Sequence, residues 1–294
     1  MIELAGKKAV ILGGKTGLLG QSLAEKLQAQ EIVTIPLSRS DFDPLNEEAL
    51  TALLEREEPD FIFNTVAYTM VDQAEDEENK AHLLNTTLPA TLGRLCKQFN
   101  VKLIHYSTDF VFDGKKDSPY TEEDPTNPQS VYGETKLAGE KRLSELGYNE
   151  ILIIRTAWLF GPHKTNFVQK ILNFAKERES LTVVHDQNGS PTYTPDLAEY
   201  TIELLKNEAH GIFNVVNSGK ASWCELATEA IDSCAINCRV DPVPTSAYPT
   251  KAKRPPYSVL DTAKFTEVTG ITPRPWVQAL RDYVYNDLKD NQED

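Results

Sequence analysis

Two side chains four residues apart, Tyr132 and Lys136, are of types that can transfer a proton. They fall in a predicted helix over residues 131–146, so they share one face about one turn apart. A phenol with its ordinary pKa of about 10 is a poor acid–base catalyst at neutral pH. A fixed ammonium nearby draws that pKa down and can also bind ribose hydroxyls. Alone, such a pair is more typical of an ordinary helix surface than of a catalytic site.

A hydroxyl side chain is expected beside this pair. The predicted strand over residues 102–107 ends in S-T-D, with Thr108 at its carboxyl end. Ligands of open α/β sheets lie beyond the carboxyl ends of strands, so Thr108 is placed to bond a substrate carbonyl oxygen together with the Tyr132 hydroxyl. The alternative is a simple turn, for which threonine and aspartate are common.

A glycine-rich turn joins the first predicted strand, residues 8–13, to a helix. Its glycines are Gly14, Gly17 and Gly20. They let the chain reverse, let the backbone approach a pyrophosphate and let the helix pack closely with its N-terminal N–H groups facing the anion. The alternative is a glycine-rich turn without a ligand. With Thr108 and the Tyr/Lys helix following in this order, the turn favours a dinucleotide-dependent enzyme.

The end of the second predicted strand bears on the choice of dinucleotide. An NAD site usually places an acidic residue there, but the chain reads L-S-R-S over residues 37–40. The hydroxyl of Ser38 and the guanidinium of Arg39 suit a 2′-phosphate. We therefore expect NADPH to be favoured, with NADH as the alternative if Arg39 is merely exposed.

The elements that position these residues alternate between strand and helix. Strands are predicted over residues 8–13, 32–37, 60–65, 102–107 and 151–156. Helices are predicted over residues 20–30, 46–57, 79–99 and 131–146, with Pro89 kinking the third or marking a joint in it. This alternation predicts right-handed crossovers and a doubly wound parallel Rossmann-type α/β sheet.

Prolines accumulate after about residue 160, and the alternation weakens. Helices are predicted over residues 166–178, 195–206, 223–233 and 276–288, strands over 181–185 and 212–216, and irregular chain over 241–258. The strand at 212–216 could rejoin the first sheet. We expect an NAD(P)-binding Rossmann domain over residues 1–163, joined by about 194–217. Residues 164–193 and 218–294 would form a smaller C-terminal substrate-binding lobe.

Composition limits the classes of partner. The net charge of −14 argues against an extended surface for nucleic acid. No apolar run approaches the roughly 20 residues needed to cross a bilayer, so no membrane contact is expected. Four cysteines in 294 residues do not form a disulfide framework, which favours a cytoplasmic protein.

Several stretches resemble the extended short-chain dehydrogenase/reductase family and, within it, the dTDP-4-dehydrorhamnose reductases. They cover residues 13–20, 60–75, 105–114, 131–140, 155–161, 186–192, 243–254 and 258–262. The glycine and Tyr/Lys motifs are shared by the whole superfamily. The motifs S-T-D-F-V-F-D-G and V-P-T-S-A-Y-P-T are far more specific to this group of reductases.

The resemblance implies NADPH-dependent reduction of the C4 ketone of dTDP-4-dehydro-L-rhamnose to dTDP-L-rhamnose. Tyr132 would donate the proton, Lys136 would bind the nicotinamide ribose, and Thr108 would orient the carbonyl. The other positions carried over are Gly17, Leu18 and Leu19 at the pyrophosphate, Asp43 at the adenine, Ala67, Tyr68, Thr69 and Tyr106 along the cofactor cleft, and Asp109 and Trp158 at the sugar. Asp43 could instead cap the next segment, and Trp158 could be a core aromatic.

Three cations in four residues, Lys251, Lys253 and Arg254, stand in a proline-rich segment. Their default interpretation is a solvated basic patch, but in an acidic protein they could clasp the substrate's diphosphate. We include Arg254 among the expected substrate-binding residues. Some family members bind magnesium between subunits through a glutamate in the first helix. Ser22 stands there in this chain, so we expect no metal, and a homodimer is left undecided.

Two other functions compete with this one. The first is another nucleotide-sugar 4-ketoreductase or an epimerase of the same family. The second is a catalytically silent NADP-binding subunit that regulates a partner. Such proteins usually lose part of the catalytic set, whereas Thr108, Tyr132 and Lys136 are all present.

Overall fold

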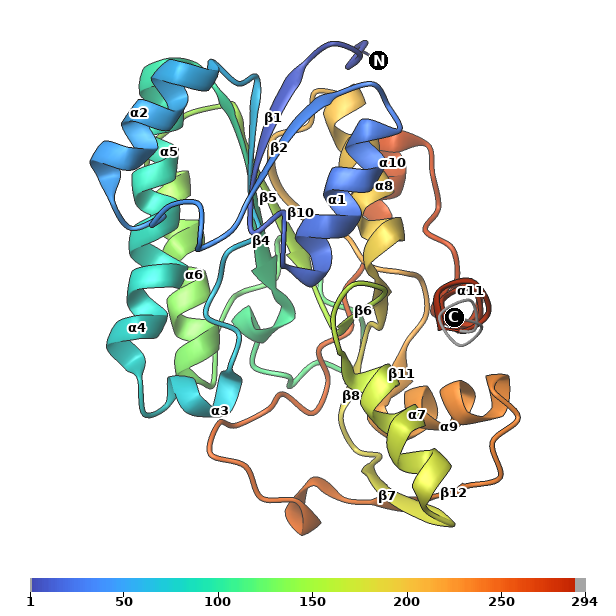
Figure 1. Cartoon of the computed structure of the whole chain (residues 1–294). Coiled ribbons are helices and arrows are strands. Elements are labelled where there is room, and N and C mark those ends of the chain that lie inside the picture. Colours follow the sequence, from blue (N-terminus) through green and yellow to red (C-terminus); the bar gives the residue numbers. More distant parts are fainter. Residues whose placement is uncertain (1, 289–294) are drawn as a thin grey trace.

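The structure, a computed structural model, describes residues 2–288 and is built around a six-stranded parallel sheet (Figure 1). The strands lie in the order β10-β5-β4-β3-β1-β2. They are β1 (Lys8–Leu12), β2 (Val33–Leu37), β3 (Phe61–Asn64), β4 (Lys102–Thr108), β5 (Ile151–Thr156) and β10 (Gly211–Asn214). The chain winds in opposite directions from β1, which confirms the predicted doubly wound α/β fold.

Helices cover both faces of the sheet (Figure 1). One face carries α1 (Leu18–Gln28), α8 (Thr194–Lys206) and α10 (Ala263–Thr269). The other carries α2 (Glu47–Glu57), α5 (Leu88–Phe99) and α6 (Val131–Ser144). Side chains of β1 alternate between the two cores, with Ala9 and Ile11 in the first and Val10 and Leu12 in the second. This double burial explains why the strands read as continuous apolar runs.

The long helical stretch predicted over residues 79–99 has a joint where Pro89 suggested one. It consists of α4 (Glu78–His82), a π-helical turn over Leu83–Thr87 and then α5, with Pro89 in its first turn. Proline is tolerated there because it lacks the N–H that a first turn leaves unpaired. A short helix, α3 (Val71–Ala74), precedes this stretch and was not predicted.

A second hydrophobic core lies in the part of the chain expected to bind substrate. Its elements are α7 (Phe167–Glu177), β7 (Ser180–Val184), α9 (Trp223–Ser233), β12 (Arg239–Val243) and α11 (Trp276–Asp282), which runs on into a π-helical turn over Tyr283–Leu288. Strand β12 pairs with β7 in a two-stranded sheet, although this region was predicted to be irregular. Residues 289–294 of the predicted lobe lie outside the described residues.

Two short ladders join this core to the sheet. Strand β6 (Leu159–Phe160) pairs with β9 (Thr192–Tyr193), and β8 (Asn188–Gly189) pairs with β11 (Ala221–Ser222). The predicted return of the chain to the first sheet is confirmed, since β10 pairs with β5. The boundaries proposed for the two lobes stay a prediction.

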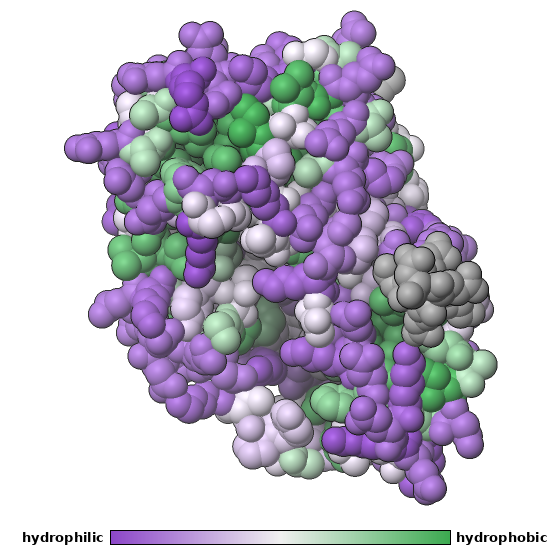
Figure 2. All heavy atoms as spheres, in the orientation of Figure 1, coloured by the Kyte–Doolittle hydropathy of each residue, from purple (hydrophilic) through white to green (hydrophobic). Residues whose placement is uncertain are grey.

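The surface seen in Figure 2 is mostly hydrophilic, with hydrophobic side chains confined to smaller patches. Across residues 2–288, none of the helices combines the length and apolar character that crossing a membrane requires.

Candidate functional site

The strand and the helix that carry the predicted catalytic residues come together at the carboxyl end of β4. Thr108 is the last residue of β4, and α6 begins at Val131, capped by the Ser130 hydroxyl, which accepts from the N–H of Gly133 at 3.2 Å. The cap fixes the first turn of α6, where Tyr132 lies. The Thr108 hydroxyl lies close enough to that of Tyr132 to act on the Tyr132 pKa, which it lowers. The structure therefore brings this predicted pair together.

Asp109, expected at the sugar, is 2% exposed, and both its carboxylate oxygens have partners. Oδ1 accepts from the Thr108 hydroxyl at 3.0 Å, and Oδ2 accepts from the Ser258 hydroxyl at 2.5 Å. Burial raises the pKa of Asp109 to about 6. Sequence analysis missed Ser258 because its partner is 149 positions away along the chain. A hydroxyl of the substrate would compete with these two hydroxyls for the Asp109 carboxylate.

Lys136 is buried and bonds to the backbone of β4. Its Nζ donates to the carbonyl oxygen of Tyr106 and lies 3.4 Å from His105 Nε2. Burial lowers the pKa of Lys136 to about 8, against the opposing effect of the Glu140 carboxylate. The ammonium is thus held next to the catalytic strand end.

The expectation that Lys136 lowers the pKa of Tyr132 is not met. Burial raises the Tyr132 pKa to about 12, and the Asp109 carboxylate adds to that rise. The nearby Thr108 hydroxyl acts in the opposite direction but does not prevail. The phenol is therefore protonated at neutral pH and carries a proton to give, but the raised pKa makes it a weaker acid than a free phenol.

A buried ion pair lies behind these residues. Arg155 on β5 binds Glu140 on α6 through two nitrogens, with Nη2 to Oε2 at 2.7 Å and Nε to Oε1 at 3.1 Å. The hydroxyl of Ser107 also donates to Glu140. This network ties α6 to β4 and β5 and so fixes where α6 presents Tyr132 and Lys136. It was not predicted, because neither charged residue stands out in the sequence.

The glycine turn has the close contacts that its spacing implied. A Cβ at Gly17 or Gly20 would lie 2.6 or 2.3 Å from the carbonyl oxygen of Gly13. A Cβ at Gly14 would lie 2.7 Å from Cβ of Pro36. Side chains at these positions would collide with the backbone or with β2, so glycine is required for the turn to close.

The N-terminus of α1 is open toward this turn. The helix begins at Leu18, and its N-cap, Gly17, provides no side-chain hydrogen bond to the first turn. The N–H groups of Leu18 and Leu19 are among those that a helix leaves without an internal partner. With the helix dipole they form a site for an anion, so the turn fits the pyrophosphate of a dinucleotide.

The end of β2 holds an acidic residue that sequence analysis overlooked. Asp41 accepts from the N–H and the hydroxyl of Ser38, both at 2.7 Å, and from Lys15 Nζ at 2.6 Å. The Lys15 ammonium contributes most to lowering the Asp41 pKa to about 2. Arg39 is exposed beside this group. Because Lys15 neutralises Asp41, the carboxylate does not by itself oppose a 2′-phosphate here.

The other positions expected to line the cofactor cleft differ in their surroundings. The backbone of Tyr68, between Ala67 and Thr69, is held by the side chain of Asn85, which accepts from Tyr68 N–H at 2.9 Å. The ring of Tyr106 instead lies in the core under α8 with its hydroxyl 3.1 Å from that of Thr201. The prediction that its side chain lines the cleft is therefore wrong, because alternate residues of β4 face opposite sides.

Asp43, expected near the adenine, is exposed, and its Oδ1 accepts from Leu45 N–H at 3.0 Å. This is the capping role that was its alternative. Trp158, expected at the sugar, is half-buried and stacks on Trp223, with ring centroids 3.5 Å apart. It lies two residues after the end of β5, whose last residue, Thr156, pairs with Thr108.

The three cations of the proline-rich segment all have partners. Arg254 forms two hydrogen bonds with Asp72 in α3, at 2.6 and 3.0 Å. Lys251 pairs with Asp76, and Lys253 Nζ donates to Gln129 at 3.3 Å. Lys251 and Lys253 are nevertheless exposed, so the alternative of a solvated basic patch stays open for these two lysines. The segment is held against α3 by charges that an anionic ligand would compete with.

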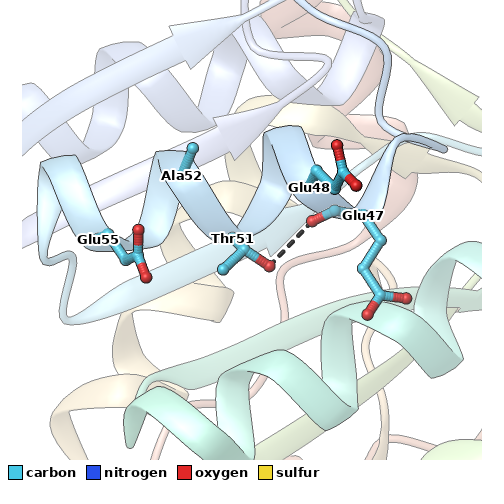
Figure 3. A pocket seen from close by; sticks show the side chains of 5 residues that line it. All are labelled: Glu47, Glu48, Thr51, Ala52 and Glu55. Atoms are coloured by element: carbon cyan, nitrogen blue, oxygen red, sulfur yellow. Dashed lines mark hydrogen bonds between the residues drawn. The ribbon is translucent and has the colours of Figure 1, made fainter.

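A surface depression on α2 lies away from this site (Figure 3). It is lined by Glu47, Glu48, Thr51, Ala52 and Glu55. Its three carboxylates would repel the phosphates of a dinucleotide or nucleotide sugar, so it is not the candidate site. Within residues 2–288, no cluster of His, Cys, Asp and Glu side chains is arranged as a metal ion would need. Whether a metal binds between two chains stays a prediction.

The known proteins that resemble this chain along most of its length include reductases of dTDP-sugars. The sequence profile of the RmlD substrate binding domain matches residues 8–288. A dTDP-4-dehydrorhamnose reductase from Shigella flexneri is 37% identical over 282 residues, 91% of this chain and 94% of that protein. A dTDP-4-keto-6-deoxy-D-glucose reductase from Streptomyces niveus is 36% identical over 272 residues, 92% of this chain and 94% of that one.

A solved structure of similar fold covers almost the same length. It is the dTDP-4-dehydrorhamnose reductase from Bacillus anthracis str. Ames in complex with NADP, with a TM-score of 0.91 and 32% identity. The alignment covers 95% of this chain and 98% of that one. The chain therefore belongs to the RmlD substrate binding domain family, the family of the dTDP-4-dehydrorhamnose reductases.

Proposed function

We propose that this chain uses NADPH to reduce the C4 ketone of dTDP-4-dehydro-L-rhamnose to dTDP-L-rhamnose. The observation that carries the proposal is the pairing of the Thr108 and Tyr132 hydroxyls at the carboxyl end of β4. A carbonyl oxygen placed between two such donors gains negative charge as it is reduced, and both hydroxyls stabilise it. The relatives that match along the whole chain support the same reaction.

The roles of the three catalytic residues follow from their surroundings. When bound, NADPH supplies the hydride. Tyr132, whose pKa of about 12 keeps it protonated, donates the proton that the product alkoxide needs. Thr108 orients the carbonyl from the strand end. Lys136, charged and held beside the strand by the Tyr106 carbonyl, binds the nicotinamide ribose.

The cofactor is proposed to lie across the ends of β1, β2 and β3. The N–H groups of Leu18 and Leu19, with Gly14 and Gly17, bind the pyrophosphate. Ser38 and Arg39 bind the 2′-phosphate. Asp43 lies on the adenine side, and Ala67, Tyr68 and Thr69 follow β3 along the cleft.

The dTDP-sugar is proposed to bind between the sheet and the smaller lobe. Trp158 and Asp109 contact the sugar, and Arg254 binds the diphosphate. Arg254 gives two N–H groups to Asp72 and a third to the Ala252 carbonyl, so Asp72 competes with a diphosphate for the charge of the guanidinium.

The test follows NADPH oxidation with dTDP-4-dehydro-L-rhamnose as substrate. The wild-type chain is expected to turn over, and Tyr132→Phe to lose at least about a hundredfold in kcat, as for loss of a general acid. Tyr148→Phe is the matched control, since the Tyr148 hydroxyl donates to the backbone carbonyl of Val101 at 3.1 Å, just before the amino end of β4 and away from its carboxyl end. Turnover that survives Tyr132→Phe would contradict the mechanism.

A second reaction has support of its own, because one relative is a dTDP-4-keto-6-deoxy-D-glucose reductase. Reduction of another nucleotide-sugar 4-ketone, or epimerisation, would use the same fold. Comparing kcat/KM for the two dTDP-4-keto sugars separates these functions. A silent NADP-binding subunit would bind NADPH and turn over neither sugar.

We also infer a cytoplasmic protein without a nucleic-acid partner, from the net charge of −14 and the small soluble substrates. A homodimer is the assembly to test, by light scattering at several protein concentrations.

A further inference from the structure

Trp158 and Trp223 form a face-to-face pair beside the catalytic strand ends. Their ring planes are 6° from parallel, with centroids 3.5 Å apart. Phe167 packs on Trp223 at 4.6 Å, tilted by 55°. Trp158 thus has one face of its indole covered by a second indole, which is itself supported by the smaller lobe.

The backbone of Trp158 is in a conformation that tryptophan rarely adopts. Its φ is +48°, in the left-handed region. Such a conformation persists only where the surroundings impose it, and it is common at functional sites. The conformation turns the chain directly after β5 and so directs the indole toward the smaller lobe.

Gly189 fits against the edge of the same indole. A Cβ at this position would lie 2.4 Å from Cε2 of Trp158 and 2.7 Å from its Nε1. Gly189 is the ladder partner of Ala221 in the β8–β11 pair, and Trp223 follows β11 directly as the first residue of α9. The β8–β11 ladder therefore fixes the position of Gly189, which contacts the edge of Trp158, and that of Trp223, which stacks on its face.

Trp223 is anchored independently of the stack. Its Nε1 donates to Gln187 Oε1 at 3.2 Å, and Gln187 Nε2 donates to the hydroxyl of Thr245 at 3.0 Å. The capping box between Ser222 and Glu225 fixes the start of α9. The second indole is held on its own lobe, so it can set the position of the first.

We propose that Trp223 is a positioning residue for sugar binding, which acts by holding the Trp158 indole in one orientation, with Gly189 as the required small neighbour. This inference rests on the proposed function, in which Trp158 contacts the sugar. A flat, fixed apolar surface at the strand ends would orient the sugar ring of a nucleotide sugar and leave the cofactor site unaffected.

The test compares Trp223→Leu with Trp223→Phe. The chain has three tryptophans, and Trp276→Phe is the matched control, because Trp276 lies in α11 with its Nε1 bonded to the Lys220 carbonyl. Exciton coupling between stacked indoles gives a circular dichroism couplet that reports the pair directly. Both Trp223 variants should lose it, and Trp276→Phe should retain it.

Kinetics then separate positioning from general damage. Trp223→Leu should lose on the order of tenfold in kcat/KM for the dTDP-sugar, as expected for loss of one aromatic pair and its packing, with the KM for NADPH unchanged. Trp223→Phe should recover most of that loss. Gly189→Ala, whose added methyl group pushes on the edge of the Trp158 indole, should lower kcat/KM for the dTDP-sugar about as much as Trp223→Leu. Loss of the couplet with unchanged sugar kinetics would overturn the inference.

If wild-type protein binds NADPH but turns over no sugar, the proposed function fails on its own. The inference is then decided by titrating dTDP-L-rhamnose and following the couplet. A couplet that the sugar nucleotide alters in wild type, with weaker binding to Trp223→Leu, supports it. Equal binding to both proteins would contradict it.

Discussion

The buried ion pair between Arg155 and Glu140 gives the sharpest prediction about stability. The side chains are 3% and 2% exposed, and three hydrogen bonds of 2.7 to 3.3 Å join them. Arg155→Met keeps much of the apolar stem but removes the guanidinium, so the Glu140 carboxylate stays buried with the hydroxyl of Ser107 as its remaining side-chain partner. Breaking a buried pair in this way costs about 3–5 kcal/mol, a large part of the roughly 5–15 kcal/mol that stabilises a typical domain.

The assay is urea unfolding followed by circular dichroism, with the free energy of unfolding taken by linear extrapolation. Glu140→Gln combined with Arg155→Met should recover much of the loss, because a neutral amide costs less to bury and still accepts from Ser107. Arg239→Ala, which removes the exposed pair with Asp241, serves as the control and should leave unfolding unchanged. If Arg155→Met is no more destabilising than Arg239→Ala, the argument from burial is wrong.

Three further predictions concern activity. Arg39→Ala should lower kcat/KM for NADPH by about 10- to 100-fold, which corresponds to the loss of one charge-assisted hydrogen bond, and leave kcat/KM for NADH unchanged. A tenfold preference of the wild-type protein for NADH would refute the assignment. Asp72→Asn should lower the KM for the dTDP-sugar by about two- to fivefold, because the diphosphate no longer competes with a carboxylate for Arg254, whereas Arg254→Ala should raise that KM with little change in kcat. Burial places the pKa of Lys136 at about 8, so its ammonium is lost as pH rises through that value, and kcat/KM should fall on the alkaline side of about pH 8. A profile that stays flat across the alkaline range would show that the charge of Lys136 is not needed.

The elements that could be predicted are those with local signals. The helix predicted to begin at residue 46 has such a signal, since the Asn46 side chain accepts from Ala49 N–H at 3.1 Å and caps α2. Strand β12 was missed because Pro242 stands within it. The proline is tolerated because β12 has a neighbour on one side only in its two-stranded sheet. Helix α10 was missed because it has only 7 residues, although the Asp261 side chain accepts from Ala263 N–H at its start.

The candidate site also contains residues that local sequence signals could predict and residues that they could not. Tyr132 and Lys136 could be found because four residues on a helix bring side chains to one face. The actual partners of Lys136 and Asp109 could not, since His105 and Ser258 are 31 and 149 positions away from them. Asp41 was overlooked although it follows the inspected segment directly. Its effect depends on Lys15, 26 positions earlier, which only the folded chain brings to it.

The long-range contacts at the site have a common consequence for how tightly substrate can bind. Asp109, just after β4, bonds to Ser258 in the C-terminal segment, and Arg254 of that segment bonds to Asp72 in α3. Two residues expected to bind the dTDP-sugar thus already bind parts of the chain far from them in sequence. Where a contact with substrate replaces one of these internal contacts, only the difference between the two contributes to affinity. The same exchange would loosen the C-terminal segment from the sheet when substrate enters. Removing both internal partners, as in Ser258→Ala with Asp72→Asn, should therefore strengthen sugar binding while lowering the stability of the protein without substrate. If the double variant instead binds the sugar more weakly, these residues serve the site by holding the lobes in place and not by competing with substrate.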